Sequence, residues 1–390
     1  MTYDTIIVGA GPAGSTCAYR LARAGASVLL LDRARFPRDK PCGGGVTLRA
    51  ARVLPIGLDP VVEDVVTTVD LRLRYGRRFE RGGRRPLVLM TQRRRLDAYL
   101  AEQAVLAGAT FRDGAKVERV EARSDGVSVF VGGERLDART LVGADGANGI
   151  CARALELGGN QAVGVAIEGN VVYERVRTDR YRGRVVLELC VVPGGYGWVF
   201  PKGDHVNVGV GGWEEEAPRL RGHLARVCEA HGISTTDLTD VRGHRLPLRA
   251  PGSTLARGRA LLVGDAAGLI DPISGDGMYE GFLSAEHAAE AVLDVLAGKE
   301  ETLDPYGARL TRLLATHLWA AWGVKAALER FPRTTFRLAR TGIVWRTVER
   351  LVCGDVPDVG EVRGVARPPL RALGMLARAA GNPGQAYREV

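Results

Sequence analysis

Residues 4–14 read Asp-Thr-Ile-Ile-Val-Gly-Ala-Gly-Pro-Ala-Gly, an apolar run that ends in three glycines at the G-x-G-x-x-G spacing. In a strand-to-helix turn the first glycine makes the turn, the second admits a pyrophosphate, and the third lets helix and strand pack closely. Residues 12–24 fit a helix, and the apolar run 26–31 ends in an aspartate, the residue type that binds ribose hydroxyls. The segment therefore predicts a βαβ unit that binds a dinucleotide through Gly9, Gly11, Ala13, Gly14, Asp32 and Arg33.

Two distant segments repeat the pattern of a buried strand followed by a glycine/aspartate turn, Leu-Val-Gly-Ala-Asp-Gly-Ala at 141–147 and Ala-Leu-Leu-Val-Gly-Asp-Ala-Ala-Gly at 260–268. An aspartate at such a strand end can accept hydrogen bonds from ribityl hydroxyls, while the next helix dipole faces a phosphate or a flavin edge. With these three ordered motifs, residues 3 to about 295 resemble the glutathione-reductase-like FAD proteins of the aromatic hydroxylase type. The resemblance implies FAD as the cofactor, with Asp145 and Asp265 beside it.

Two further segments narrow the chemistry, Phe-Pro-Arg-Asp-Lys-Pro-Cys-Gly-Gly-Gly at 36–45 and Tyr-Gly-Trp-Val-Phe-Pro-Lys at 196–202. Both look like the geranylgeranyl reductase family, which carries P-x-x-K-x-C-G-G and Y-x-W-x-F-P-K. Residues 268–278 resemble that family's G-[LF]-x-x-P-x-x-G-E-G-I, with Asp276 in place of Glu and Met278 in place of Ile. The resemblance implies reduction of carbon–carbon double bonds in an isoprenoid or lipid substrate. It also implies flavin contacts from Cys42, Gly43, Gly44, Gly45, Pro272, Gly275, Gly277 and Met278.

Three side chains in these segments are candidate catalytic residues, namely Cys42, Tyr196 and Trp198. The glycines after Cys42 let the backbone lie flat against an aromatic ring system, so that its thiol could act as a proton source near an alkene. The alternative is a small buried hydrophobe. Tyr196 and Trp198 share one face of a strand and could wall an apolar tunnel, with the tyrosine hydroxyl as a second candidate acid. The alternative is an aromatic ladder packed in a sheet core.

Two weaker assignments follow from the same resemblance. Residues 93–97, Arg-Arg-Arg-Leu-Asp, are similar to the R-x-x-[FL]-D helix start of hydroxylase-like proteins, which implies that Arg93 lies near the flavin. The alternative is that all three arginines face water, as charge runs usually do. Val117 falls in the segment whose backbone meets adenine in such proteins, although no motif marks it.

The remaining texture of the chain predicts its domain organisation. Residues 163–173, 184–192 and 205–211 alternate or run β-branched between glycine and proline clusters, which favours a mostly antiparallel second sheet. We expect an α/β fold in which a discontinuous FAD-binding, Rossmann-like domain of the glutathione-reductase type is interrupted by a substrate domain. The first comprises residues 1–70, 93–160 and 255–300, the second 71–92 and 161–254, and a basic helical region 301–390 follows.

Composition limits the partners and the compartment. The net charge of +9 admits nucleic acid, an anionic membrane or an acidic ligand, and the absence of a recognition motif disfavours nucleic acid. Six cysteines without C-x-x-C spacing make a disulfide framework or a metal site improbable. No basic leader or long uncharged apolar stretch is present, so we expect a cytoplasmic protein.

The tail is basic, with twelve Lys/Arg and six Asp/Glu in its final 66 residues. Phe336, Ala339, Ile343, Val344, Val348, Leu351 and Val352 fall near the spacing of one helical face, and Arg333, Arg337 and Arg340 form a cationic stripe. Such a helix could lie on the inner face of a membrane and admit an isoprenoid tail from the lipid. The alternative is a helix docked on the protein's own core.

Two other functions compete with isoprenoid reduction. A flavin monooxygenase or halogenase uses the same scaffold, although a halogenase should carry W-x-W-x-I-P where this chain has Tyr-Gly-Trp-Val-Phe-Pro at 196–201. A flavin redox or electron-transfer protein needs no substrate pocket. Because no second G-x-G-x-x-G is present, reducing equivalents would come from NADPH bound transiently or from another external donor.

Overall fold

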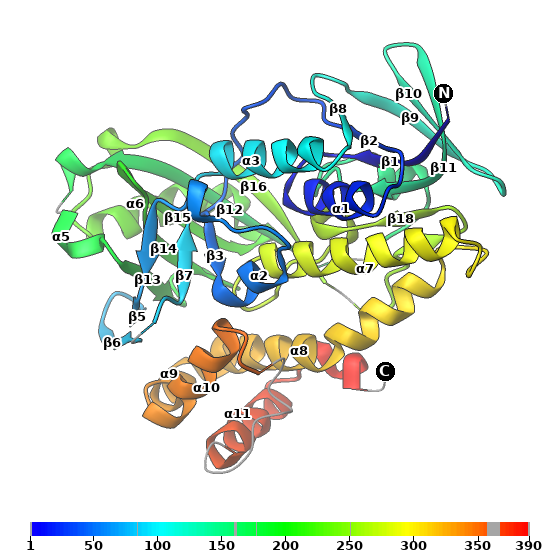
Figure 1. Ribbon diagram of the computed structural model, residues 1–390. Helices are drawn as coiled ribbons and strands as arrows, with labels where there is room; N and C mark the ends of the chain where they lie inside the picture. The colour runs from blue at the N-terminus through cyan, green and yellow to red at the C-terminus, as the bar shows by residue number, and fades with distance from the viewer. Residues whose placement is uncertain are drawn as a thin grey trace.

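The computed structural model describes residues 2–83, 85–159, 162–176, 178–249, 251–356 and 367–388. Within these ranges the strands form an eight-stranded, a seven-stranded and a three-stranded sheet, and a layer of C-terminal helices lies below them in Figure 1. The architecture is α/β, as the sequence predicts.

The eight-stranded sheet is parallel in its centre, with the order β18-β11-β1-β2-β8. The hairpin strands β9 and β10 add to β11, and β17 pairs with β18 at the edge. Both strands of the segment 127–143 thus belong to the first sheet. The strand bounds are β1 Thr2–Val8, β2 Val28–Leu31, β8 Thr110–Arg112, β9 Val117–Ala122, β10 Val127–Val131, β11 Glu134–Gly143, β17 Ala256–Arg257 and β18 Ala260–Leu262.

Helices α1 (Pro12–Arg23), α3 (Arg93–Leu106) and α7 (Met278–Leu296) lie beside this sheet, and α1 packs on both α3 and α7 (Figure 1). The central strands are apolar and buried, as strands covered on both faces must be. Because parallel strands end at the same edge, the turns after β1, β11 and β18 meet there. Two short helices complete this part, α2 Leu48–Val53 and α4 Cys151–Ala154.

The seven-stranded sheet has the order β16-β12-β15-β14-β13-β5-β6 and is antiparallel except for the pair β5·β13. A mostly antiparallel second sheet is therefore confirmed. An arginine-rich hairpin formed by β5 and β6 lies at one edge of this sheet and begins at Thr68. The bounds are β5 Thr68–Leu73, β6 Arg77–Gly82, β12 Ala162–Val172, β13 Arg184–Leu189, β14 Tyr196–Pro201, β15 His205–Trp213 and β16 Thr239–Leu248, with α5 Thr178–Tyr181 and α6 Leu220–Ala230 alongside.

A small third sheet, β3-β7-β4, was not expected from the sequence. Its strands are β3 Gly45–Thr47, β4 Asp64–Val66 and β7 Val88–Met90. Three residues are too few to show the alternation that reveals a strand, so only the tertiary pairing defines them. The sheet follows directly after Cys42–Gly44 and ties that turn to the segment before α3.

The C-terminal region forms helices α8 (Pro305–Arg330), α9 (Pro332–Ala339), α10 (Gly342–Val352) and α11 (Arg367–Ala379), followed by a short 3-10 segment, Pro383–Arg388. The expectation of one continuous amphipathic helix through residues 333–352 is wrong. Thr341 takes an extended conformation between α9 and α10, and this divides the apolar face between Ala339 and Ile343.

The apolar face of α9 and α10 packs on the protein itself. Phe336 is buried against Leu73 and Phe79, with its ring centroid 5.0 Å from that of Phe79, and Trp345 is buried beside Leu87. Docking on the protein's own core, the second interpretation of the tail, is therefore what the structure shows for these side chains. Contact with a membrane stays a prediction.

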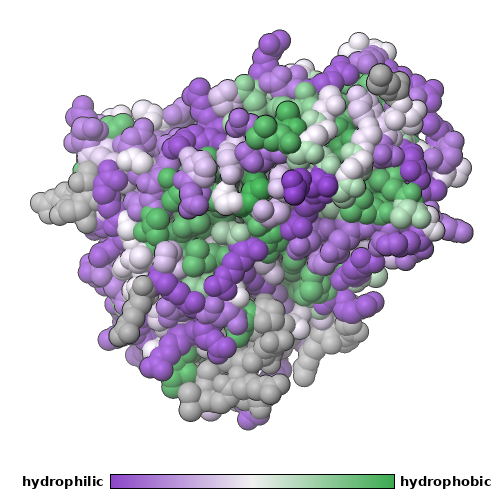
Figure 2. Space-filling model, viewed as in Figure 1, coloured by the Kyte–Doolittle hydropathy of each residue, from purple (hydrophilic) through white to green (hydrophobic). Residues whose placement is uncertain are grey.

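Hydrophobic side chains come to the surface mainly across the middle of the face shown in Figure 2, with hydrophilic ones around them. Among the residues described, helices combining the length and apolarity needed to cross a bilayer are absent. The most exposed large apolar side chains lie on separate elements, such as Leu106, Leu313 and Met375. Room for a large apolar ligand must therefore be sought inside the protein.

Candidate active site

A cavity of about 1440 Å³ lies between the two large sheets and continues under the C-terminal helices. It exceeds the ~300–1,000 Å³ usual for pockets that hold drug-sized molecules. All of the predicted site residues line it except Gly14. The structure thus brings together segments that are up to about 270 residues apart in the sequence.

The first glycine turn is packed as its motif requires. Gly9 has φ +106°, and a Cβ there would overlap the carbonyl of Ala144 in the turn after β11. A Cβ on Gly14 would overlap the carbonyl of Gly9, which explains why this third glycine serves packing rather than the cavity wall. Gly11 begins α1 without a side-chain cap, so the first N–H groups of the helix face the cavity end without a side-chain acceptor.

Asp32 is buried at the end of β2 and is held by backbone donors. Its Oδ2 accepts the N–H of Ala10 at 2.9 Å, and its Oδ1 accepts the N–H of Ala34 at 2.9 Å. A carboxylate has about four lone-pair sites, so capacity for ribose hydroxyls remains. Arg33 is exposed at the cavity edge, and Val117 is buried in its wall at the start of β9.

Arg93 is buried, whereas Arg94 and Arg95 are exposed, so the solvated interpretation holds for only two of the three arginines. Arg93 forms a bidentate pair with the fully buried Asp97, both bonds at 2.7 Å, and Arg38 reaches the same carboxylate at 2.8 Å. Although burial opposes its charge, Asp97 raises the pKa of Arg93 above its ordinary value. The guanidinium is thereby fixed in the cavity wall, facing Gly11.

The two other aspartates occupy different electrostatic settings. Asp145 Oδ2 accepts the N–H groups of Ile150 and Cys151 at 2.6 and 2.9 Å, while its buried Oδ1 has no hydrogen-bond partner among the described residues. Asp265 Oδ2 binds Lys40 Nζ at 2.9 Å. Burial opposes ionisation there, but Lys40 and His244 hold the pKa of Asp265 well below its usual range.

The turn Cys42–Gly44 is held by buried charges and by close packing. The Cys42 N–H donates to Glu168 Oε1 at 2.6 Å, and the Lys202 ammonium donates to the carbonyl of Gly43. The Phe200 ring would lie 2.8 Å from a Cβ at Gly43. The two motifs that resemble geranylgeranyl reductases, 36–45 and 196–202, are therefore in direct contact.

The aromatic side chains of β14 form a row along the cavity, with centroids 6.0 Å apart for Tyr196 and Trp198 and 6.2 Å for Trp198 and Phe200. Trp198 Nε1 donates to Asn207 Oδ1 at 2.7 Å. The indole lies over Gly209 on β15, where a Cβ would collide with it. The row lines the cavity wall and is anchored from behind, so it is both a packed ladder and a tunnel wall.

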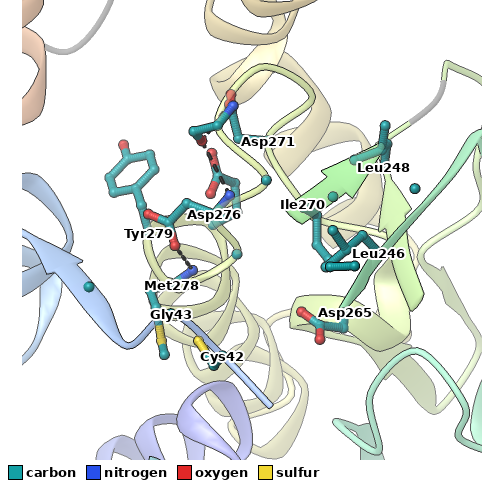
Figure 3. A pocket seen from close by; sticks show the side chains of 18 of the residues that line it. Cys42, Gly43, Leu246, Leu248, Asp265, Ile270, Asp271, Asp276, Met278 and Tyr279 are labelled. Atoms are coloured by element: carbon teal, nitrogen blue, oxygen red, sulfur yellow. Dashed lines mark hydrogen bonds between the residues drawn. The ribbon is translucent and has the colours of Figure 1, made fainter. Parts of the chain in front are cut away.

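The loop after β18 closes the site opposite the Cys42 turn (Figure 3). The Tyr196 hydroxyl donates to the carbonyl of Ser274, which ties the second sheet to this loop. Asp276 Oδ1 accepts the N–H of Met278 at 2.8 Å, at the start of α7. Burial and the neighbouring Glu280 and Asp271 raise the pKa of Asp276 to about 7.

Beneath this loop His317 of α8 joins two buried carboxylates. His317 Nε2 lies 3.0 Å from Asp271 Oδ2 and 3.4 Å from Glu280 Oε1, and Arg49 Nη1 lies 3.3 Å from His317 Nδ1. Although burial opposes protonation, the two carboxylates raise the pKa of His317 to about 9. The His317 imidazole thus links the C-terminal helices to the loop.

Comparison with known proteins agrees with this geometry. The family described as FAD binding domain matches residues 2–318. A geranylgeranyl diphosphate reductase of Rhodobacter capsulatus is 34% identical over 322 residues, which cover 78% of this chain and 78% of that protein. The chain belongs to the geranylgeranyl reductase family of FAD-dependent oxidoreductases. The predictions of family, FAD and enzyme class are confirmed.

Other relatives show the breadth of this family and of its fold. A menaquinone reductase of Mycobacterium tuberculosis is 33% identical over 312 residues, covering 74% of this chain and 76% of that protein. A geranylgeranyl bacteriochlorophyll reductase-like protein of Thermoplasma acidophilum has a TM-score of 0.75 at 21% identity, covering 100% of this chain and 98% of that one. A flavin-dependent brominase also reaches 0.75, at 18% identity and 97% and 100% coverage. The fold alone therefore does not select the reaction.

The residues of this oxidoreductase fit FAD. The uncapped start of α1 offers N–H groups to a pyrophosphate, and the guanidinium groups of Arg38 and Arg93 lie within 4 Å of the Cβ position at Gly11. The orphaned Asp145 Oδ1 is a buried acceptor that needs a donor such as a ribityl hydroxyl. Asp32 keeps capacity for ribose. These residues would hold the cofactor, and the Gly43–Gly45 backbone would lie beside its ring system.

Several residues of the site were missed by sequence reasoning. Glu168, Asn207 and His317 lie outside the quoted motifs and reach the site only through tertiary packing. Lys202 was quoted as part of a motif without a role. Gly209 had a readable signal, because Gly209, Gly211 and Gly212 stand in the strand that follows the aromatic run. Glycines inside a strand often mark the close approach of a large group.

Proposed function

We propose that this protein reduces carbon–carbon double bonds of an isoprenoid chain, with the hydride supplied by reduced FAD. The observation that carries the proposal is the extent of the cavity. From the glycine and aspartate turns, where the flavin would bind, the cavity continues into an apolar branch, which we call the apolar limb. That limb runs between β5 and β13 of the second sheet and helices α8 to α10. Its walls include Leu71, Leu187, Val324, Phe336, Trp345 and Val348.

An apolar limb of this kind favours a long hydrocarbon chain over a compact aromatic substrate. Burying a prenyl chain there removes apolar surface from water at about 25 cal/mol per Å². The names of the relatives support the same class, because they include a geranylgeranyl diphosphate reductase and a menaquinone reductase. We propose an isoprenoid chain of a lipid, diphosphate or quinone as the substrate.

The chain's own residues would orient the alkene and supply a proton. The Cys42 thiol stands at the turn where the flavin end meets the aromatic row, and Gly44 N–H donates to its Sγ at 3.4 Å. Tyr196 Oη is a second candidate donor, and burial raises the pKa of this phenol well above its ordinary value, so it stays protonated. Trp198 would wall the tunnel, and the closed loop 270–278 would exclude water.

The source of electrons and the route of the substrate are finer parts of the proposal. We propose that NADPH or another external donor reduces the flavin in a transient encounter. Arginines exposed on β6 and α9, among them Arg77, Arg78 and Arg337, lie near the apolar limb and favour an anionic membrane surface as the origin of the substrate.

The deciding experiment is an anaerobic incubation of the dithionite-reduced holoprotein with geranylgeranyl diphosphate and, separately, with menaquinone. Mass spectrometry should find a product heavier by two hydrogens for each bond reduced. A product that gains oxygen in air would instead favour the monooxygenase alternative. The absence of any product with either compound, together with an unchanged flavin spectrum when they are added, would favour an electron-transfer protein.

A further inference from the structure

Two buried side chains of opposite charge, both supplied by the second sheet, form hydrogen bonds with the turn Cys42–Gly44. Glu168 on β12 is 9% exposed, and its Oε1 accepts the Cys42 N–H at 2.6 Å. Lys202 follows β14 and is 2% exposed; its ammonium donates to the carbonyls of Gly43 and, at 2.7 Å, Thr91. Both therefore act on backbone groups, one at each of two successive residues.

A buried charge is costly unless it is bonded, so these bonds must be strong enough to retain both groups. Burial raises the pKa of Glu168, and the bond from Cys42 and the charge of Lys202 oppose that rise. Burial likewise lowers the pKa of Lys202. Glu168 binds the Cys42 N–H, whereas Lys202 binds the carbonyls of Gly43 and Thr91, so the two side chains act on different backbone groups.

The turn has little freedom to adopt another path. Gly44 has φ +73°, and a Cβ there would overlap the Lys202 ammonium and the Thr91 carbonyl. The Gly44 carbonyl accepts the N–H of Thr91 at 2.8 Å and its hydroxyl at 3.0 Å. Three successive residues are thus fixed through their backbone groups.

We propose that Glu168 and Lys202 are positioning residues, which hold the Cys42 thiol and the Gly43–Gly44 backbone at the flavin site. Asn207 binds Trp198 through its Oδ1 and Asn170 through its amide nitrogen, so the second candidate catalytic side chain is also anchored by a polar group of the second sheet. The inference rests on the proposed function only for the catalytic role of Cys42. The holding itself is a property of the chain.

The test measures the accessibility of Cys42 without any substrate. Full-length FAD-free protein is treated with iodoacetamide, and the alkylation rates of Cys42 and Cys190 are followed by peptide mass spectrometry. Cys190 lines the same cavity but lies outside the turn, so it reports general loosening. The variants are Glu168→Ala, Glu168→Gln and Lys202→Met, with FAD affinity as the second measurement.

The matched control is Glu216→Ala. Glu216 is also 9% exposed, but it binds Arg219 and His223 away from the turn. In Glu168→Ala and Lys202→Met, iodoacetamide should alkylate Cys42 about tenfold faster than in the wild type, and FAD should bind more weakly. Both changes are expected from the loss of a charge-assisted hydrogen bond. Glu168→Gln keeps an acceptor oxygen and should stay near the wild-type rate, as should Glu216→Ala.

Equal Cys42 rates in wild type and Lys202→Met would overturn the proposal, and so would a parallel rise at Cys190. If Glu168→Ala does not fold, as judged by circular dichroism, Lys202→Met decides alone. Because neither readout uses an isoprenoid, failure of the reductase activity would leave this result intact, and the two proposals can fail separately.

Discussion

The two ends of the cavity are built in different ways. At the nucleotide end, glycines after β1 and aspartates after β2, β11 and β18 shape the wall, and Asp32 and Asp145 accept hydrogen bonds from backbone groups of these turns. At the Cys42 end, the aromatic rings and buried charges bring together four separate segments, which are the turn itself, β12, residues 196–202 and β15. The first end depends on conformation, whereas the second depends on which distant side chains meet.

The difference has an energetic consequence. A glycine turn packed against backbone has almost no room for an added atom. A single methyl group at such a glycine should therefore abolish binding of the nucleotide. Buried charges and rings are satisfied pairwise, so their loss should be graded and partly rescued by conservative replacements. Four predictions test this contrast, beginning with the largest effect.

Gly9→Ala should produce protein that does not retain FAD. The added Cβ would overlap the carbonyl of Ala144, and the positive φ of this position adds strain. We therefore expect the free energy of unfolding to fall by roughly 4 kcal/mol or more. Flavin absorbance of the purified protein and a thermal melt measure it. Gly222→Ala is the control, because Gly222 lies in α6 with open space around its Cβ position and should be neutral or slightly stabilised.

Arg93→Met should destabilise the protein by about 3 kcal/mol and weaken FAD binding, because it breaks a bidentate pair with the buried Asp97. Arg38 remains as a second partner of that carboxylate and limits the loss. Urea unfolding and FAD titration are the measurements. Arg94→Met, one residue further along the exposed face, should change stability by less than about 0.5 kcal/mol. Equal effects of the two variants would show that Arg93 contributes no more than an arginine that faces water.

Cys42→Ala should keep its yellow colour and lose turnover by about 100-fold, the usual size of a proton-transfer contribution. Steady-state kinetics under anaerobic conditions measure kcat. Cys190→Ala removes another half-buried thiol of the same cavity and should keep normal turnover. Unchanged turnover in Cys42→Ala would leave this thiol a packing role.

The smallest effect concerns pH. The pKa of His317 is raised to about 9 in the folded protein from an ordinary value of 6.5. Its stabilising contribution is therefore fully present below pH 6.5 and is lost as the pH rises through 9. Unfolding free energies should fall over this window by less than the roughly 3 kcal/mol that a shift of this size gives for an isolated group, because His317 is coupled to Asp271 and Glu280. In His317→Gln the fall should largely disappear, and an unaltered slope would show that other groups cause it.

The contrast between the two ends also explains what sequence could foresee. Local sequence patterns predict the βαβ unit, the Asp145 and Asp265 turns and the antiparallel sheet. This is because strand burial and glycine conformation depend on residues that are neighbours in the sequence. Their meeting in one cavity confirms that part of the prediction for the fold. The flavin contacts and catalytic roles assigned to individual residues stay predictions.

The rest could not be foreseen for a physical reason. Glu168 and His317 are ordinary charged residues in sequence, and only tertiary packing buries them beside Cys42 and Asp271. The break between α9 and α10 was missed because periodicity continues across it, while the extended Thr341 interrupts the helix. The three-residue strands of the third sheet lack any pattern of their own.

The fit of Trp198 over Gly209 has an evolutionary consequence. The indole fills the space that a side chain at residue 209 would need, because the two residues face each other on paired strands. A relative with a smaller ring at the first position could tolerate alanine or serine at the second. Substitutions at these two positions should therefore be correlated across homologous sequences, and a bulky residue at both should be absent.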